Sequence, residues 1–271
     1  MRGLFTCGVL DVFMENGIVF DGAAGISAGA TFGCNYKSRQ IGRALRYNLR
    51  FSRDPRYCSL QSLLKTGDLY GAEFCYKTIP DELDPFDREA FRTNPMAFYI
   101  GATETASGKT RYHLCTDGGE RDILWMRASA SMPMVSRPVE IGSRTYLDGG
   151  ITDAVPFLFM EGQGFDRNVM VLTQPRGYRK KPAKLQGVMK LLLRNMPAIS
   201  RAMQERPAMY NGQMEDIEKR EAAGQSLVIR PPRDLGIGRT EKDPEKLRQV
   251  YEIGRKTGEE ALPRVRSFLG Q

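Results

Sequence analysis

A glycine-rich turn between a strand pattern and a helix pattern constrains the fold of this chain more than any other feature. The turn is Gly25-Ile-Ser27-Ala-Gly29, and the apolar segment 18–24 before it predicts a short buried strand. A helix is expected to follow from Ala28 toward Arg50. A serine between small residues at such a turn is typical of a nucleophile elbow, in which the helix N-terminus faces the reacting group. The same pattern also fits a helix N-cap serine in a purely structural turn.

The remaining hydrophobic pattern alternates between strands and helices. Helical spacing occurs over 3–16, 122–130, 155–161 and 244–268, and over 184–223 with breaks expected at Pro197 and Pro207. Strands are expected at 97–102, 110–115, 168–172 and 226–230, with a hairpin over 135–147 and irregular structure over 54–95. Such alternation predicts an α/β sheet covered by helices on both faces.

A second motif supplies a partner for the serine. Asp148 ends the predicted strand 144–147 and is followed by Gly149 and Gly150, which would let the acid approach another backbone closely. A rival Asp-Gly-Gly begins at Asp117, but its polar neighbours indicate a solvated loop that enters a helix. We therefore expect Asp148 to be the acid that acts with the serine.

The single histidine, His113, limits the possible chemistry. A multi-histidine metal site is excluded, and a Ser-His-Asp triad would have to use His113, which lies in a predicted hairpin where a local hydrogen bond is expected. The five cysteines include no Cys-x-x-Cys pair, which favours reduced thiols over disulfides or a zinc site. No metal and no cofactor is predicted.

Three motifs together resemble those of the patatin-like phospholipases. They are the serine turn at 25–29, the segment Ala128-Ser-Ala-Ser-Met-Pro133, and Asp148-Gly-Gly150, in the order that the family uses. The resemblance spans residues 1–175, and Arg206-Pro-Ala-Met-Tyr-Asn211 with the closing helix is similar to the C-terminal extension of bacterial members. It implies a three-layer α/β/α sandwich with a mostly parallel central sheet. A catalytic domain would cover 1–175, and a helical, basic extension, 176–271, would pack on the same domain.

The resemblance also implies a function. Ser27 would be the nucleophile and Asp148 its partner in a dyad without histidine, cleaving lipid esters of the phospholipase A or lysophospholipase type through an acyl-enzyme. Gly25, Gly29, Gly149 and Gly150 would complete the motifs, and Ala28, Arg2 and Gly3 would form the oxyanion site. The alternatives are a soluble carboxylesterase or thioesterase without lipid preference, and a catalytically impaired lipid-binding protein.

The N-terminus departs from the family pattern. Members carry a Gly-Gly-Gly-x-Arg-Gly loop after a first strand, and Met1-Arg2-Gly3 matches only the last three positions of that loop. Loss of one oxyanion donor costs on the order of 10² to 10³ in rate, and loss of a strand leaves a sheet edge unpaired. We therefore expect either that the sequence begins late or that the oxyanion site is impaired.

The charge distribution suggests a surface role. The net charge is +8, and between Arg176 and Arg206 nine Lys or Arg face one acid, Glu205. A solvated basic face and contact with an anionic membrane through 176–206 both remain open, whereas nucleic acid is not expected. No apolar stretch reaches the length of a membrane span, and no secretory signal is recognised. We expect a cytoplasmic protein, peripheral to the inner face of the membrane.

Overall fold

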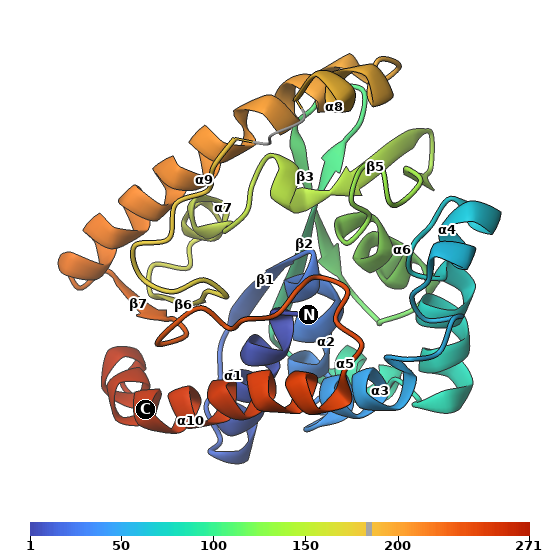
Figure 1. The fold of residues 1–271 in the computed structure, drawn as a ribbon. Helices are drawn as coiled ribbons and strands as arrows, with labels where there is room; N and C mark the ends of the chain where they lie inside the picture. The colour runs from blue at the N-terminus through green and yellow to red at the C-terminus, as the bar shows by residue number, and fades with distance from the viewer. Residues whose placement is uncertain (183–185) are drawn as a thin grey trace.

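The structure, a computed structural model, describes residues 1–182 and 186–271 (Figure 1). The strands are β1 (Gly22–Ile26), β2 (Ala97–Glu104), β3 (Thr110–Cys115), β4 (Val139–Ile141), β5 (Arg144–Asp148), β6 (Asn168–Val171) and β7 (Ser226–Ile229). The helices are α1 (Gly3–Glu15), α2 (Ala28–Lys37), α3 (Arg43–Phe51), α4 (Leu60–Thr66), a π-helical segment (Phe74–Leu83), α5 (Arg88–Thr93), α6 (Glu120–Ser129), a 3₁₀ turn (Gly149–Ile151), α7 (Phe157–Gly162), α8 (Gln186–Leu192), α9 (Pro197–Ala222) and α10 (Pro244–Leu269).

The central sheet is mixed, which corrects the prediction of a mostly parallel one. Strand β1 is parallel to β2, whereas β3 and β5 are antiparallel to β2, and β4 is antiparallel to β5. The short turns at Ser107-Gly108 and Gly142-Ser143 account for two of these pairings, because a short turn can connect only antiparallel neighbours. The third, between β2 and β5, joins strands that are far apart in the sequence. Strands β6 and β7 form a separate parallel pair.

Two consecutive residues of β2 show how the layers are built. Phe98 packs edge-on against Phe91 of α5, and the next residue, Tyr99, packs edge-on against Phe159 of α7. Neighbouring side chains of a strand point to opposite faces, so these contacts place helices on both sides of the sheet. The predicted three-layer arrangement is therefore confirmed.

The closing helix α10 packs along α1, the first helix (Figure 1). Glycines allow their backbones to approach closely: a Cβ on Gly8 would lie 2.2 Å from the carbonyl oxygen of Tyr251, and one on Gly254 would lie 2.1 Å from that of Phe5. Strand β7, which like α10 lies after residue 175, pairs with β6 and so also connects the C-terminal part of the chain to the part before that residue. The boundary at residue 175 stays a prediction.

Two predicted helices have different bounds in the structure. The helix expected over 28–50 is divided into α2 and α3 by a turn in which Arg39 and Gly42 have positive φ. In the segment 184–223, α9 begins at Pro197 but continues through Pro207, so the break expected there is wrong. Both halves of α9 bury apolar residues, which holds the helix together despite the missing hydrogen bond. Residues 184 and 185 lie outside the described residues.

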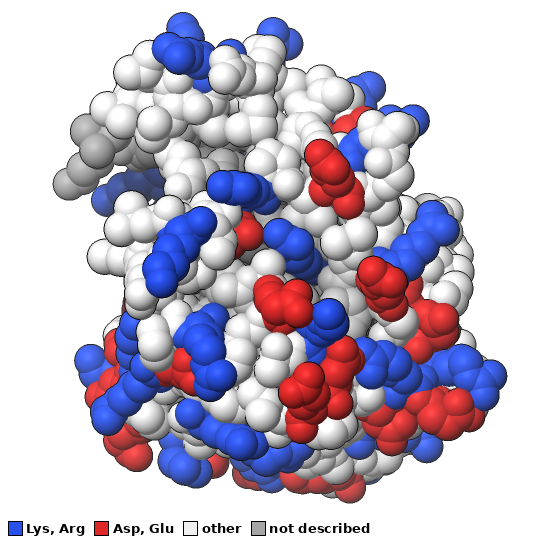
Figure 2. Space-filling model, turned by 90° about the vertical axis from the view of Figure 1, so that its right-hand side faces the viewer, with Lys and Arg blue, Asp and Glu red and all other residues white. Residues whose placement is uncertain are grey.

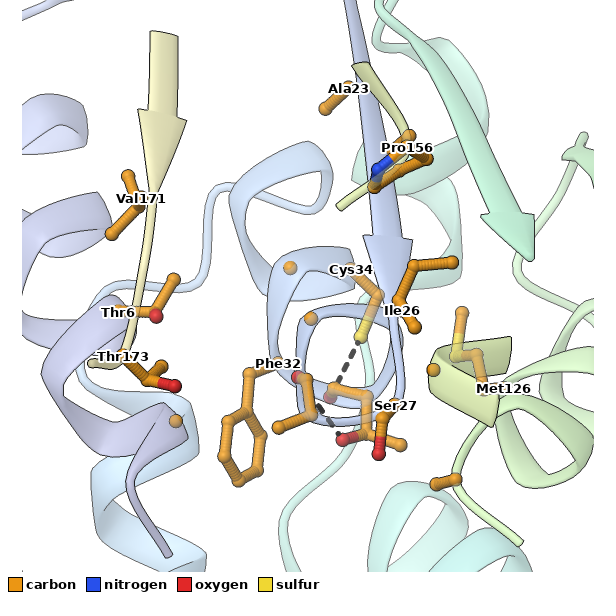
Figure 3. Close-up of a pocket in the computed structure, with 18 of the residues that line it drawn as sticks. Thr6, Ala23, Ile26, Ser27, Phe32, Cys34, Met126, Pro156, Val171 and Thr173 are labelled. Atoms are coloured by element: carbon orange, nitrogen blue, oxygen red, sulfur yellow. Dashed lines mark hydrogen bonds between the residues drawn. The ribbon is translucent and has the colours of Figure 1, made fainter. Parts of the chain in front are cut away.

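A cavity of about 1090 Å³ separates β1 from β6. Within the described ranges, β1 pairs only with β2 and β6 only with β7, so each strand has one unpaired edge, and both strands line this cavity. Figure 3 shows Ile26 of β1 and Val171 of β6 on opposite sides of it. An unpaired sheet edge was expected from the sequence. Among the described residues, every helix is too short or too polar to span a bilayer.

Candidate active site

Ser27 lies at the sharp turn between β1 and α2 and borders the cavity (Figure 3). Its φ of 54° and ψ of −115° are unfavourable for a residue with a side chain and cost on the order of 1–3 kcal/mol. The turn also requires small neighbours, because a Cβ on Gly25 would lie 2.4 Å from the carbonyl oxygen of Gly29. The strained turn places Ser27, which is partly exposed, directly before α2 and at the border of the cavity.

Strand β2 brings the ends of β1 and β5 together. Ile26, the last residue of β1, pairs with Gly101, and Asp148, the last residue of β5, pairs with Ala102. Because β3 occupies the other edge of β2 at these positions, β1 and β5 share one edge and end facing each other. The Ser27 hydroxyl therefore donates a 2.6 Å hydrogen bond to Oδ2 of Asp148.

The backbone around Asp148 fixes its carboxylate. The Gly150 N–H donates to Oδ1 at 2.7 Å, and the Asp148 N–H donates to the carbonyl oxygen of Ser131 at 2.7 Å. A Cβ on Gly149 would lie 2.2 Å from the carbonyl oxygen of Gly101, so only glycine fits where β5 meets β2. The Asp-Gly-Gly sequence thus has a steric cause.

Ser129 was not recognised as a site residue from the sequence. Its hydroxyl donates to the carbonyl oxygen of Gly101 at 2.6 Å and accepts the Ser27 N–H at 2.9 Å. Together, Ser129 and Ser131 connect the C-terminal end of α6 to both the serine turn and Asp148. The Ser-x-Ser spacing at a helix end was the available signal, but it indicated only close packing.

Burial dominates the electrostatics of Asp148, which is 1% exposed. Desolvation raises the pKa of Asp148, opposed by the Ser27 hydrogen bond and the positive charge of Arg206. The Arg206 Nε donates to the carbonyl oxygen of Gly150 at 2.6 Å, which holds the guanidinium near the acid. A raised pKa makes the carboxylate a stronger proton acceptor than an ordinary aspartate.

The three residues expected to form the oxyanion site also border the cavity. Ala28 begins α2, and Arg2 and Gly3 begin α1. A Cβ on Gly3 would lie 2.8 Å from that of Ala28, so the two helix starts touch beside Ser27. The first N–H groups of a helix have no acceptor in a preceding turn, and they carry partial positive charge.

The rival acid Asp117 lies elsewhere. Its side chain is exposed and accepts the Gly119 N–H at 2.9 Å in a local turn. It does not border the cavity that contains Ser27.

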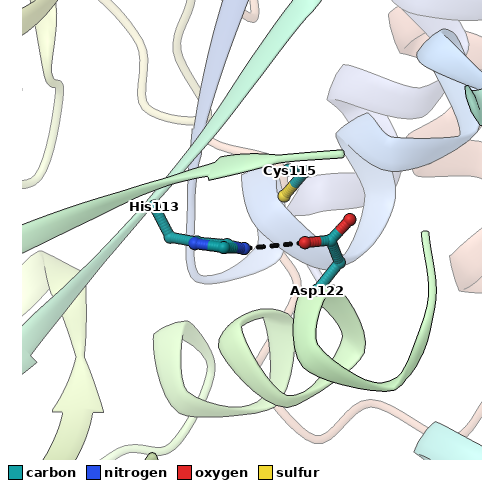
Figure 4. A group of neighbouring side chains, drawn as sticks. All are labelled: His113, Cys115 and Asp122. Carbon is teal, nitrogen blue, oxygen red and sulfur yellow. Dashed lines mark hydrogen bonds and ion pairs between the residues drawn. The ribbon is translucent and has the colours of Figure 1, made fainter. Parts of the chain in front are cut away.

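His113 belongs to a separate cluster with Cys115 and Asp122 (Figure 4). Its Nε2 is 2.7 Å from Oδ1 of Asp122, and its ring stacks on Trp125 at 5.1 Å. The other oxygen of Asp122 accepts three backbone N–H groups of residues 116–118. Burial alone raises the pKa of Asp122, but the hydrogen bonds from His113 and the backbone outweigh it and lower the pKa.

The potential ligand atoms of this cluster lie within 4.8 Å of one another, as a metal site requires. Both oxygens of Asp122 already have partners, however, and they close the turn that begins α6. The local hydrogen bond expected for His113 is therefore present. The cluster does not border the cavity, so the histidine is not placed to act on Ser27.

Comparison with known proteins gives two family matches. The family described as "Patatin-like phospholipase" matches residues 1–160, which contain the serine turn and the Asp-Gly-Gly motif. A domain of unknown function, DUF6363, matches residues 196–270.

Relatives are similar to this chain at low identity. The uncharacterized protein YjjU of Escherichia coli is 27% identical over 99% of this chain and 76% of its own length. An uncharacterized NTE family protein of Mycobacterium tuberculosis is 25% identical over 63% of this chain and 45% of its own length. Lysophospholipase nte1 of Aspergillus terreus is 26% identical over 98% of this chain but only 18% of its own length.

Proposed function

The chain belongs to the patatin-like phospholipase family, and on this basis we propose that it is a serine acyl hydrolase that cleaves phospholipid or lysophospholipid esters. Family membership and the lysophospholipase relative support lipid hydrolysis. The observation that carries the proposal is the 2.6 Å hydrogen bond from the Ser27 hydroxyl to the buried carboxylate of Asp148. A nucleophile in hydrogen-bond contact with its base is the requirement for covalent catalysis of this kind.

The reaction begins with proton transfer from Ser27 to Asp148. As Oδ2 of Asp148 takes the hydroxyl proton, Oγ attacks the ester carbonyl and the carbonyl π electrons move onto oxygen. The N–H groups at the starts of α1 and α2, those of Gly3 and Ala28, are the candidate donors to this oxyanion.

Collapse of the tetrahedral intermediate releases the alcohol and leaves an acyl-enzyme. The protonated Asp148 gives its proton to the departing alkoxide and is ionised again. It then takes a proton from water, whose oxygen attacks the acyl carbonyl, and finally returns that proton to Oγ of Ser27. No metal is needed in this sequence, because one carboxyl group performs each proton transfer.

Covalent labelling tests the proposal. A fluorophosphonate should label the protein at Ser27, identified by mass spectrometry of the modified peptide, because only an activated serine reacts rapidly. Labelling requires ionised Asp148, so its rate should fall as the pH decreases through the pKa of this group. Burial raises that pKa above the ordinary 3.8, which places the midpoint at a higher pH.

The Ser27→Ala variant is the control, and it should take up no label. Absence of labelling in the wild type would favour an inactive lipid-binding protein. Rapid hydrolysis of simple esters with none of lipid esters would favour an esterase without lipid preference.

We further propose peripheral contact with an anionic membrane in the cytoplasm, through the region 176–206. The support is the surface of α8, which leaves Val188, Leu191 and Leu192 exposed while Met189 and Leu193 pack inward. Basic residues flank the exposed apolar ones, as expected of an interfacial helix. The free thiols are consistent with a reducing compartment.

Replacement of Leu191 by aspartate should weaken binding to vesicles that contain phosphatidylglycerol by about tenfold, because a charge replaces a side chain inserted among the lipids. Co-sedimentation measures the binding. Leu64→Asp is the matched control, since Leu64 is an exposed leucine on another helix. Equal binding by both variants and the wild type would contradict membrane contact through α8.

A further inference from the structure

Four basic side chains from distant parts of the sequence surround the site of Ser27. They are Arg2, Lys180, Arg206 and Arg239, called the cationic cluster below, and all of them border the same cavity. Among the described residues, none of the four forms a salt bridge.

Several other basic residues of the cavity and its surroundings have acidic partners. In the cavity, Arg43 pairs with Asp84 and Arg127 with Asp68. Arg179, the neighbour of Lys180, pairs with Glu218 of α9. On the face shown in Figure 2, basic and acidic side chains are interspersed over the lower half. Absence of a salt bridge alone does not distinguish the four, because other basic residues, such as Arg167 of the same cavity, also form none. The four are distinguished by lining the cavity together with Asp148.

Helix α9 orders two members of the cluster. Arg206 donates through Nε to the carbonyl oxygen of Gly150, and no protein acceptor is found for its other nitrogens within the described chain. One turn later, the Asn211 side chain accepts the Lys180 N–H at 2.8 Å and donates to the Lys180 carbonyl oxygen at 3.1 Å. The Lys180 ammonium lies over the ring of Tyr210, 4.9 Å from its centroid. The segment 206–211 therefore builds one wall of a pocket.

The energetics of this pocket favour an incoming anion. Burial, and to a smaller extent the positive charges of Arg206, Arg239 and Arg2, lower the pKa of Lys180 to about 8. Asp148 is the acid that opposes these charges, and its single negative charge cannot balance four cations. Three other acids border the cavity. Asp68 is already paired with Arg127, Asp21 precedes β1 at the end opposite Ser27, and Asp166 follows Phe165, which lies against Gly22 at that same end.

We propose that the cationic cluster binds the phosphate of the substrate headgroup, so that the enzyme prefers lipid esters with net negative charge to zwitterionic ones. This inference rests on the proposed acyl hydrolase function. Arginine and lysine in a partly desolvated pocket form strong, charge-assisted hydrogen bonds with phosphate oxygens. A choline or ethanolamine group would bring a fifth positive charge into the same pocket, and repulsion would offset part of the gain.

The test compares two soluble short-chain substrates with the same acyl group, lysophosphatidylglycerol and lysophosphatidylcholine, below their micelle concentrations. We expect the wild type to prefer the anionic substrate in kcat/KM by about tenfold, mostly through KM, as for one hydrogen bond to a charged group. Lys180→Gln should remove most of this preference. Arg179→Gln removes one positive charge at the neighbouring residue, whose side chain pairs with Glu218. This variant should keep the preference for the anionic substrate.

Inorganic phosphate supplies a second measurement. It should inhibit hydrolysis of a neutral p-nitrophenyl ester competitively, and more weakly in Lys180→Gln than in Arg179→Gln. Equal use of the two lipids would overturn the headgroup proposal, and phosphate inhibition without a lipid preference would assign the pocket to free phosphate instead. Hydrolysis of the neutral ester and fluorophosphonate labelling report separately on the proposed function, so failure of the two proposals can be told apart.

Discussion

Replacement of Asp148 by asparagine is expected to lower kcat/KM for ester hydrolysis on the order of 10⁴-fold, as comparable replacements do in other serine hydrolases. The asparagine amide preserves the shape of the carboxylate and its contact with the Gly150 N–H, but it cannot accept the Ser27 proton. Steady-state kinetics with a p-nitrophenyl ester measure the effect. Ser27→Ala should cause a loss of similar size.

The fold should survive this replacement. Burial raises the pKa of Asp148, so the ionised carboxylate is less favourable in the folded protein than in the unfolded chain. Any stabilisation from such a group is present at low pH and is lost as the pH rises through the raised pKa, so at neutral pH the neutral amide costs no stability. Thermal melting should therefore give an equal or higher Tm.

Asp117→Asn is the matched control, because Asp117 begins the second Asp-Gly-Gly of the chain but is exposed and away from the cavity. It should keep wild-type activity. Near-normal hydrolysis by Asp148→Asn would rule out the proposed dyad.

The second large effect concerns folding. Gly254→Ala should destabilise the protein by about 3 kcal/mol or more, at the upper end of the range for overpacked cores. The new Cβ would lie 2.1 Å from the carbonyl oxygen of Phe5 and within 3 Å of two further backbone atoms of that residue. No side-chain rotation relieves a clash with backbone, so α10 and α1 would have to separate.

Gly212→Ala provides the control. Gly212 lies inside another long helix, α9, and a Cβ added there would have no neighbouring atom within 4 Å outside that part of the helix. That replacement should be neutral or should stabilise by up to about 1 kcal/mol through helix propensity. Denaturant unfolding measures both. A free energy of unfolding within about 0.5 kcal/mol of the wild type for Gly254→Ala would contradict the close helix contact.

Part of this fold was accessible from the sequence because the signals are local. The turn at 25–29 and the Asp-Gly-Gly at 148–150 indicate sharp backbone and close approach, and the structure gives steric reasons for both. The layers also followed from the alternation of strands and helices. The two hairpins were expected, but the prediction of a mostly parallel sheet was wrong, because the periodicity of a strand does not report that β5 pairs with β2 in the antiparallel direction.

The remaining features depend on contacts between distant segments. The facing ends of β1 and β5 on β2 arise from register, which no local pattern encodes. The pairing of Ser129 with Ser27, and of Asn211 with Lys180, joins side chains that carry no periodic signal. The helix through Pro207 shows that tertiary packing outweighed the local preference of proline.

The position of Ser27 and Asp148 at one edge of β2 has a consequence for cooperativity. Neither residue can move away without breaking the pairing of a central strand, so we expect the proposed dyad to belong to the unit that opens only in global unfolding. In the described part of the chain, the loop that carries Lys180 is joined to α9 only through side chains, among them that of Asn211 and the ion pairs Arg176–Glu221 and Arg179–Glu218, and we expect it to belong to a unit that opens more easily. Backbone amides of this loop should therefore exchange with solvent faster than those of β1 and β5. On warming, the proposed headgroup preference should be lost at a lower temperature than ester hydrolysis.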